Sequence, residues 1–472
     1  MTEPERPLRL DAPREEALEH AAKLVAEAWR SFDRPRPEEP PLDERIRRIL
    51  QDPLPRGPVS VHEALDDAAR ALDESIAQPR PRYFAFIGSS GLEIGTLGDL
   101  LAATYDMNLA VDARAATVLE QQAVRWVGEF VGYPATNGAF TSGGTISNMT
   151  ALAAARERAL PGSRAAGLGG ARVAVYASAE VHYSITRAVE LLGIGSDRLR
   201  DVAIDERHRM RADLLAEAID RDIRDGVTPI AVVATAGTTL TGAVDPLAAI
   251  AGVCGERGIW FHVDGAYGLP AASVDPGRFE GAARADSVSV DAHKWLYVPK
   301  ACSVVLVRER GALSEAFAHE EGYLPHQRHE LHAVDITLEY SRPLRALKLW
   351  LAFRAHGADQ FREAIRRNLA EARLLHREAA ARPDFETFGA PPDLSIVPIR
   401  HVPDGVADLD AHNDALADAI QADGRVYLAS ALIGDEVWLR PCFVNYRTTD
   451  DDVLAVLDVA AELGERIARE RR

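Results

Sequence analysis

The sequence predicts an α/β protein whose mostly parallel sheet is covered by helices on both faces, followed by a smaller α+β domain. Apolar runs of strand length alternate with helical segments between residues 79 and 357, which is typical of parallel sheets. After residue 357 a long helical stretch is followed by short strands and a closing helix. At 472 residues the chain is long enough for two or three such units.

The first 78 residues predict a helical segment rather than a domain. Residues 13–31 have the apolar spacing of an amphipathic helix, and the proline-rich stretch DRPRPEEPPLDE that follows is typical of a connector. The segment 1–78 has too little apolar content to fold alone. We therefore expect it to pack on a partner subunit or on the main body of the protein.

The large domain, residues 79–357, is predicted from its order of strands and helices. Apolar runs predict strands at 172–178, 201–205, 228–236, 258–264, 286–290 and 302–307. Helical segments at 211–226 and 246–258 separate several of these strands, and residues 138–160 are expected to form a strand, a glycine-rich turn and a helix. Because such sheets bind ligands beyond the carboxyl ends of their strands, the residues that follow each run are the functional candidates.

The small domain, residues 358–472, begins with helical sequence at 359–383. Short strands are expected at 395–400 and 436–447, and a helix closes the chain. Between the strands of the large domain and this helix lies the polar segment 319–335, which lacks periodicity and is expected to act as a lid.

Composition excludes several classes of function. The chain has 54 basic and 72 acidic residues, a formal charge of −18, which argues against a nucleic-acid or anionic-membrane surface. Cys254, Cys302 and Cys442 lie far apart without paired spacing, which indicates reduced thiols. The first residues resemble no secretory signal, and no apolar run approaches the ~20 residues that span a bilayer. We expect a soluble, cytoplasmic protein.

Polar residues with complementary chemistry follow four of the predicted strands. Each has an ordinary structural explanation when it is taken alone, such as a helix cap or a hydrogen-bonded core histidine. Together they place an imidazole, hydroxyls, two carboxylates and a lysine at one edge of one sheet, next to a glycine-rich turn before a helix: His182, Thr239, Asp264, Asp291, His293 and Lys294, with Gly144 and Thr145 at the turn.

This set of groups fits pyridoxal 5′-phosphate. A partly desolvated lysine can form a Schiff base with the cofactor, and a carboxylate can keep the pyridine nitrogen protonated. Backbone N–H groups at a helix N-terminus can bind the phosphate, and glycines allow their close approach. Lys294 and Asp264 are therefore the leading candidates for catalysis.

Three motifs resemble those of the group II pyridoxal-phosphate-dependent amino-acid decarboxylases, which include the aromatic-L-amino-acid, tyrosine, histidine and glutamate decarboxylases. The motifs are TSGGTISN, HVDGAYG and DAHKW, and the resemblance runs from about residue 80 to 450. It implies the aspartate aminotransferase-like fold (fold type I), with a seven-stranded sheet. It also implies a homodimer with active sites at the subunit interface, and an L-amino acid as substrate.

The resemblance also implies roles around the cofactor ring and phosphate. Lys294 corresponds to the Schiff-base lysine and Asp264 to the partner of the pyridine nitrogen, while Ala266 and His182 correspond to residues on the two ring faces. Four further residues correspond to positions that bind the phosphate or join the hydrogen-bond network of the cofactor: Gly144, Thr145, Thr239 and His293. Asp291 stands where many relatives have asparagine, and a carboxylate there would repel the phosphate.

Tyr323 in the predicted lid corresponds to the loop tyrosine that donates a proton to Cα in the family's decarboxylases. Relatives that form aldehydes carry phenylalanine at that position, so Tyr323 favours simple decarboxylation. An aminotransferase, an aldehyde synthase and a catalytically silent relative stay open, although intact Lys294, Asp264 and His182 argue against the last. We expect no metal site at the lid histidines His319, His326, His329 and His332.

The resemblance implies an aromatic substrate, but the residues that support it match the family pattern only in part. Phe86, Ile87 and Gly88 correspond to substrate-pocket positions where aromatic decarboxylases usually have Tyr, Phe and Pro, and Ser341 corresponds to a position that helps distinguish phenolic from indolic substrates. Phe86 retains an aromatic wall, whereas Ile87 and Gly88 depart from the pattern. We expect an aromatic L-amino acid, with an acidic or diamino substrate as the alternative.

Overall fold

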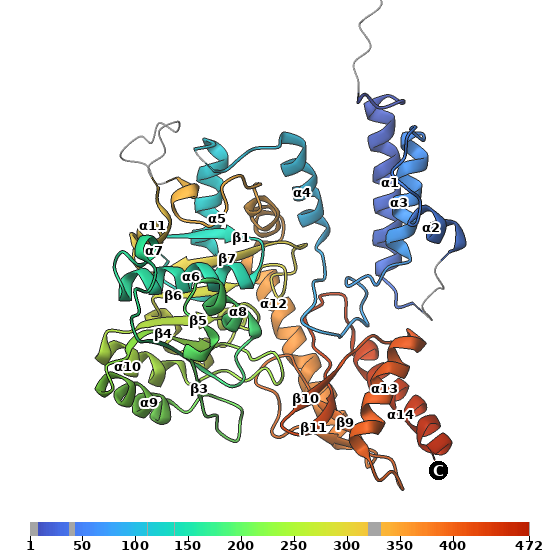
Figure 1. Ribbon diagram of the computed structural model, residues 1–472. Coiled ribbons are helices and arrows are strands. Elements are labelled where there is room, and N and C mark those ends of the chain that lie inside the picture. The colour runs from blue at the N-terminus through green and yellow to red at the C-terminus, as the bar shows by residue number, and fades with distance from the viewer. Residues whose placement is uncertain (1–7, 37–42, 111, 136, 320–331, 472) are drawn as a thin grey trace, which may run out of the picture.

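The computed structural model describes residues 8–36, 43–110, 112–135, 137–319 and 332–471. Three parts follow one another along the chain: a projecting group of N-terminal helices, a large α/β unit and a smaller C-terminal unit (Figure 1). The N-terminal helices are α1 (Arg14–Phe32), α2 (Glu44–Ile49) and α3 (Val61–Asp73). The helix predicted at 13–31 is confirmed as α1.

A seven-stranded sheet with the order β1-β7-β6-β5-β4-β2-β3 forms the centre of the large unit. Strands β3, β2, β4, β5 and β6 are parallel, and β7 runs antiparallel to both β6 and β1. The prediction of a mostly parallel, seven-stranded sheet is therefore confirmed. The strands are β1 (Asn137–Thr141), β2 (Val173–Ser178), β3 (Leu199–Val202), β4 (Thr228–Thr235), β5 (Trp260–Asp264), β6 (Ser287–Val290) and β7 (Ser303–Val307).

Both faces of this sheet are buried, which explains why its strands are continuous apolar runs rather than alternating ones. On β4, Val232 and Ala234 belong to one apolar core, and Ala231 and Val233 to another on the opposite face. The helices of the large unit are α4 (Glu93–Tyr105), α5 (Ala115–Val131), α6 (Gly144–Ala159), α7 (Ser163–Ala166), α8 (Tyr183–Leu191), α9 (Ala212–Arg224), α10 (Leu247–Arg257) and α11 (Ala312–Phe317).

Helix α6 lies against the sheet and positions the candidate site. Every residue from Ser147 to Ala155 is buried, so small side chains are required all around the helix. Helices α6, α8 and α11 contribute to the core on one face, and α5, α9 and α10 to the core on the other. No helix among the described residues is long and apolar enough to cross a membrane.

The C-terminal unit packs three helices on a four-stranded sheet with the order β10-β11-β9-β8. Its elements are α12 (Ala346–Ala380), β8 (Phe385–Thr387), β9 (Ile399–His401), α13 (Leu409–Asp423), β10 (Ser430–Ile433), β11 (Glu436–Leu439) and α14 (Asp450–Arg471). The strands predicted at 395–400 and 436–447 are shorter than expected. Pro398 and Pro441 lack the N–H that a ladder needs, so β9 begins after the first and β11 ends before the second.

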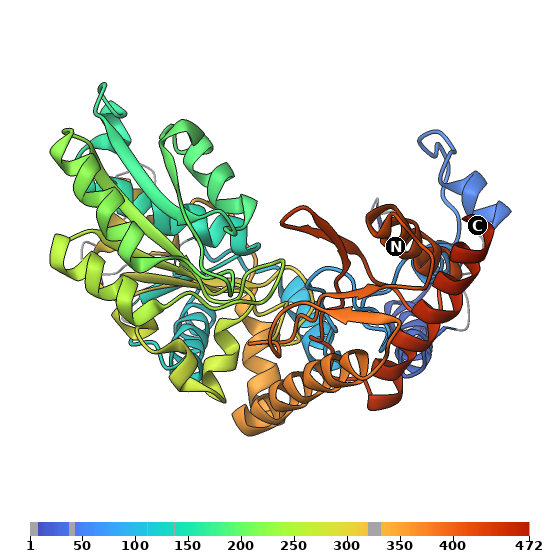
Figure 2. The same ribbon diagram turned by 90° about the horizontal axis from the view of Figure 1, so that it is seen from below.

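Helix α12 connects the two units, which lie side by side in Figure 2. It bends at Gly357, whose φ of 72° and ψ of 156° are not helical. A second connection lies just before the large unit begins in the sequence. The N–H of Phe84 donates to the carbonyl of Tyr427 over 2.7 Å, and the Phe84 ring lies in the C-terminal core. The chain thus crosses the C-terminal unit before it reaches α4. The division into segments 1–78, 79–357 and 358–472 stays a prediction.

A buried ion pair joins α5 to the segment before α12. The guanidinium of Arg342 pairs with the carboxylate of Glu120 and also donates to the carbonyl of Phe140 in β1 over 3.0 Å. Both charged side chains are buried. Burial raises the pKa of Glu120, and the charge of Arg342 opposes that shift. The pair therefore holds three parts of the large unit together.

Removing the cation alone should destabilise the fold. In Arg342→Met, Glu120 would stay buried without its partner, and the free energy of unfolding should fall by roughly 3–5 kcal/mol. The double variant Glu120→Gln/Arg342→Met should recover most of that loss. Arg366→Met, which removes an exposed pair with Glu363, is the control and should cost about 0–1 kcal/mol. Urea unfolding that gives Arg342→Met and Arg366→Met equal stability would contradict this role.

Candidate functional site

A cavity of about 310 Å³ lies beyond the carboxyl ends of the central parallel strands. This is the edge where ligand sites form in such sheets, because loops leave the strands there and helix N-termini point towards it. The cavity brings together all of the cofactor residues predicted from the sequence: Gly144, Thr145, His182, Thr239, Asp264, Ala266, Asp291, His293 and Lys294.

Lys294 lies in a turn that directly follows β6. Its N–H donates to the carbonyl of Asp291 over 3.0 Å, and the N–H of Asp291 donates to the carbonyl of Ala266 over 3.0 Å. The turn thereby ties the end of β6 to the end of β5. The Lys294 side chain is only 21% exposed, which is the partial desolvation that a reactive amine requires.

Two carboxylates determine the charge of this amine. The amine lies 3.1 Å from Asp291 Oδ2. Burial by itself would lower the pKa of Lys294, but the carboxylates of Asp291 and Asp264 outweigh burial and raise that pKa. His293 Nε2 lies 3.6 Å from the same Asp291 oxygen. Burial lowers the pKa of His293, so Lys294 is the cation that balances Asp291 near neutral pH.

Asp264 ends β5 and is held by donors on both of its oxygens. Asn148 Nδ2 donates to Oδ2 over 2.9 Å. The Ser289 hydroxyl and the N–H of Ala266 each donate to Oδ1 over 3.2 Å. Asp264 is therefore a fixed anion at the wall of the cavity.

His182 is the N-cap residue of α8. Its Nδ1 accepts a hydrogen bond from the N–H of Ser184 over 3.2 Å. Burial lowers the pKa of His182, and a neutral ring whose Nδ1 accepts must carry its proton on Nε2. The cavity thus contains an uncharged imidazole whose tautomer is set by the backbone.

The N-terminus of α6 forms a narrow cradle. A Cβ atom on Gly144 would lie 3.0 Å from Asp291 Oδ2 and 3.2 Å from the Cβ of Ala266, which is closer than ordinary contact. A side chain at Gly144 would therefore push on Asp291 and Ala266 where α6 meets the lysine turn. The N–H groups at the start of this helix form an anion site, and Asp291 lies directly beside it.

Of the predicted substrate residues, Ile87 alone lines the cavity. Phe86 has a φ of 57° and is 58% exposed. A Cβ on Gly88 would lie 3.1 Å from the ring of Tyr83, and Ser341 is exposed. Tyr323, the predicted proton donor, lies outside the described residues.

The sequence motifs did not single out several polar residues that line the cavity. Asn148 lies inside the TSGGTISN motif, one helical turn after Gly144, so its position on the cavity side of α6 could have been inferred from the spacing. Lys300 follows Lys294 by six residues, and its amine donates to Gln78 Oε1 over 2.6 Å. Thr235 is the last residue of β4, and its buried hydroxyl has no partner among the described residues.

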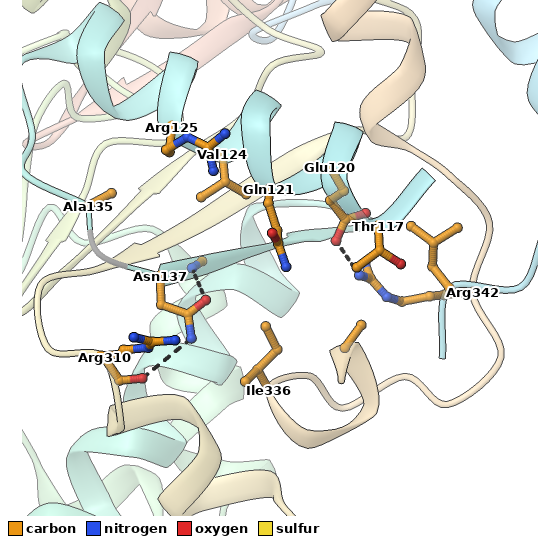
Figure 3. Close-up of a pocket in the computed structure, with 13 residues that line it drawn as sticks. Thr117, Glu120, Gln121, Val124, Arg125, Ala135, Asn137, Arg310, Ile336 and Arg342 are labelled. Carbon is orange, nitrogen blue, oxygen red and sulfur yellow. Dashed lines mark hydrogen bonds and ion pairs between the residues drawn. The ribbon is translucent and has the colours of Figure 1, made fainter. Parts of the chain in front are cut away.

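A larger cavity of about 500 Å³ lies between α5, β1 and the 3₁₀ turn Ala333–Asp335 (Figure 3). Gln121, Asn137 and Arg310 line it. Among the described residues, no lysine lines this cavity, and its buried carboxylate, Glu120, is already paired with Arg342. The smaller cavity is therefore the candidate active site.

The smaller cavity fits pyridoxal 5′-phosphate by its own chemistry. Lys294 offers an amine for a covalent link, Asp264 a fixed anion for the pyridine nitrogen, and Gly144 a cradle at a helix N-terminus. The unpartnered hydroxyl of Thr235 is a group that a ligand could satisfy.

Comparison with known proteins decides the family. Residues 43–398 match the pyridoxal-dependent decarboxylase conserved domain. The chain belongs to the pyridoxal-dependent decarboxylases. It is 30% identical over 436 residues to the aromatic-L-amino-acid decarboxylase of Bacillus atrophaeus, with 90% of this chain and 89% of the relative covered. It is 31% identical over 369 residues to the cysteine sulfinic acid decarboxylase of Mus musculus, with 75% and 74% covered.

A solved structure supports the fold. The crystal structure of Oryza sativa TDC with PLP and tryptamine matches with a TM-score of 0.90 at 24% identity, over 98% of this chain and 100% of that one. The protein is thus a pyridoxal-phosphate-dependent amino-acid decarboxylase of fold type I, and the predicted family, fold and cofactor are confirmed.

Asp291→Asn should change how this decarboxylase takes up its cofactor. The carboxylate raises the pKa of Lys294, so its removal should lower that pKa and increase the fraction of neutral amine at a given pH. The rate of covalent loading of the cofactor-free protein with pyridoxal 5′-phosphate, followed by absorbance, should rise at a lower pH than in the parent. Asp286→Asn, at the other end of β6, is the control and should keep the parental profile. An unchanged profile in Asp291→Asn would contradict this electrostatic role.

Proposed function

We propose that this decarboxylase removes the α-carboxylate of an L-amino acid as CO₂, with Lys294 as the residue that binds the cofactor covalently. The observation that carries the proposal is the position of the Lys294 amine, partly buried beside Asp291 and in the same cavity as Asp264. When bound, the cofactor supplies an electron sink for the bond that breaks. The protein residues have to orient that bond and control protons around it.

Each remaining residue then has a defined task. Asp264 would keep a proton on the pyridine nitrogen, because a carboxylate stabilises the cationic ring, and donors hold both of its oxygens in place. Neutral His182 provides a flat, uncharged face for the ring. The start of α6, at Gly144 and Thr145, binds the phosphate, with His293 beside it. Thr239, which also lines the cavity, completes the hydrogen bonds to the cofactor.

Tyr323 is our proposed proton donor to the substrate α-carbon after CO₂ has left. The support is its place in the chain relative to Lys294, which corresponds to the loop tyrosine of the family's decarboxylases. A phenol is a suitable general acid because it gives up its proton only to a strongly basic carbon.

Two substrate classes have specific support. The similarity to the Bacillus atrophaeus aromatic-L-amino-acid decarboxylase favours an aromatic side chain. Lys300 favours an anionic one: it lines the cavity with Ile87, its amine donates to Gln78, and no described carboxylate forms an ion pair with it. A substrate carboxylate or sulfinate could accept a charge-assisted hydrogen bond from this amine. The same charge disfavours a diamino substrate.

We further propose a cytoplasmic homodimer. Helices α1 and α3 project from the rest of the chain in Figure 1, and Leu18 and Leu72 on them are exposed. Leu100 and Tyr105 of α4 are exposed as well. A second copy of the chain would cover these side chains, as expected for a front segment that cannot fold alone. The free, buried cysteines fit a reducing compartment.

A screen of L-amino acids for CO₂ release, with identification of the amine, tests the proposed function. At least one aromatic or acidic amino acid should yield amine and CO₂ in equal amounts. Lys294→Ala should abolish turnover and remain folded, because it removes the covalent link and little packing. Amine formation by Lys294→Ala at the parental rate would contradict the assignment.

The same screen separates the substrate classes. If the substrate is anionic, Lys300→Met should lower kcat/KM by about tenfold or more, since it removes a hydrogen bond between charged groups. If the substrate is aromatic, Lys300→Met should leave kcat/KM within about threefold of the parent, because the ring makes no ion pair.

Tyr323→Phe should separate CO₂ release from amine formation. The variant keeps the ring and removes the acidic proton, so amine formation should fall by about 10²–10⁴-fold. Under air, O₂ and water can then convert the substrate to aldehyde, CO₂, ammonia and hydrogen peroxide. All products would be measured under air and under nitrogen. Parental amine formation without aldehyde would show that another group donates the proton.

A further inference from the structure

A row of buried polar side chains lies behind Asp264, between β5, β6 and α6. Alternate residues of β5 share one face of the sheet, and on this strand they are Trp260, His262 and Asp264. Ser287 of β6 lies beside His262 in the strand pairing. Asn148 covers the row from α6 and contacts both His262 and Asp264. Polar groups in a dry core destabilise the fold unless they are hydrogen-bonded.

Every neighbouring pair in this row is within hydrogen-bond distance. Trp260 Nε1 donates to Ser287 Oγ over 2.9 Å. Ser287 Oγ lies 2.9 Å from His262 Nδ1, and His262 Nε2 lies 3.0 Å from Asn148 Oδ1. Asn148 Nδ2 donates to Asp264 Oδ2 over 2.9 Å. We call this row the Trp260–Asp264 relay.

The two ends of the relay fix the direction of every bond when His262 is neutral. The indole N–H of Trp260 can only donate, so Ser287 accepts from it and turns its own hydrogen to His262 Nδ1. The carboxylate of Asp264 can only accept, so Asn148 turns its amide nitrogen to Asp264 and its oxygen to His262. His262 therefore carries its single proton on Nε2.

Burial supports the neutral form. His262 is 0% exposed, and burial lowers its pKa to about 4, against the attraction of Asp264 and a hydrogen bond with the Ser287 backbone. The side chains within hydrogen-bond distance of the ring nitrogens, Ser287 and Asn148, are uncharged. When His262 is neutral, every hydrogen bond of the relay donates in the direction from Trp260 to Asp264. Hydrogen bonds arranged in one direction polarise and strengthen one another.

We propose that His262 and Asn148 are positioning residues that hold Asp264 Oδ2 in place and stabilise its negative charge through the Trp260–Asp264 relay. The inference rests on the proposed pairing of Asp264 with the pyridine nitrogen. Ser289 and the Ala266 N–H hold the other oxygen, Oδ1, so the relay governs one oxygen of the two. Neither His262 nor Trp260 lines the cavity, and both act only through Asn148.

The first test measures the histidine itself. Nitrogen NMR of cofactor-free protein, with label in the histidine rings, reports which nitrogen of His262 carries the proton, and His262→Gln assigns the signal. The relay requires a neutral ring protonated at Nε2 throughout about pH 6 to pH 8. A proton on Nδ1, or a ring that gains charge in this range, would overturn the proposal. This measurement needs neither cofactor nor turnover.

A matched pair of variants tests the effect on Asp264. The amide nitrogen of glutamine reaches the position of Nε2 and keeps the donation to Asn148 in His262→Gln. The shorter side chain of His262→Asn reaches only the position of Nδ1 and breaks the relay there. Both variants place an amide in the same buried space. Asparagine is one methylene smaller than glutamine, so urea unfolding of both variants measures the packing lost in His262→Asn apart from the broken hydrogen bond.

The readouts are the protonation of the cofactor's pyridine nitrogen, from nitrogen NMR of protein loaded with labelled cofactor, and the split between kcat and KM. His262→Asn should reduce pyridine protonation and lower kcat by about tenfold or more at an unchanged KM, whereas His262→Gln should stay near the parent. Equal behaviour of the two variants would overturn the relay. If the parent releases no CO₂ from any amino acid, the proposed function fails, and the tautomer of His262 still decides the relay.

Discussion

The active site depends on holding one amine partly out of water beside two carboxylates. Desolvation makes the Lys294 amine reactive because it favours the neutral form, whereas the carboxylates of Asp291 and Asp264 favour the charged form and raise the pKa of Lys294. The sheet order places β5 next to β6, so that Asp264 and the turn carrying Lys294 end at the same edge. The α6 N-terminus meets this edge at Gly144, where a Cβ atom would lie unusually close to Asp291 and Ala266.

The two carboxylates act differently because their partners differ. Asp291 is balanced by Lys294 at 3.1 Å, whereas Asp264 is held by neutral donors from Asn148, Ser289 and its own turn. The amine that balances Asp291 is the one that would bond to the cofactor, so its position and bonding would change on loading. The donors of Asp264, in contrast, belong to the protein alone and would form no bond to the cofactor in this account. Asp264, whose charge has to stay the same throughout the reaction, is therefore the carboxylate that uncharged donors hold.

Much of this arrangement could be predicted from the sequence, and the remainder depends on packing. Buried parallel strands are continuous apolar runs, so the sheet and the polar residues at its edge could be inferred from 172–178, 228–236 and 258–264. The Trp260–Asp264 relay could not be predicted from the sequence, because it requires the pairing of His262 with Ser287 and the placement of Asn148 over both strands. Phe86 was expected to form a pocket wall, but its side chain is largely exposed. Lys300 reaches the cavity through a turn that has no periodic pattern.

The central claim is that Lys294 carries the cofactor, and mapping the covalent link tests it most directly. Protein loaded with pyridoxal 5′-phosphate would be reduced with borohydride, digested with trypsin and analysed by mass spectrometry. Trypsin does not cleave after a modified lysine, so the account predicts the reduced label on the peptide of residues 285–300, uncut after Lys294. A label on Lys300, found in a peptide that begins at residue 295, or no label on any lysine, would contradict it.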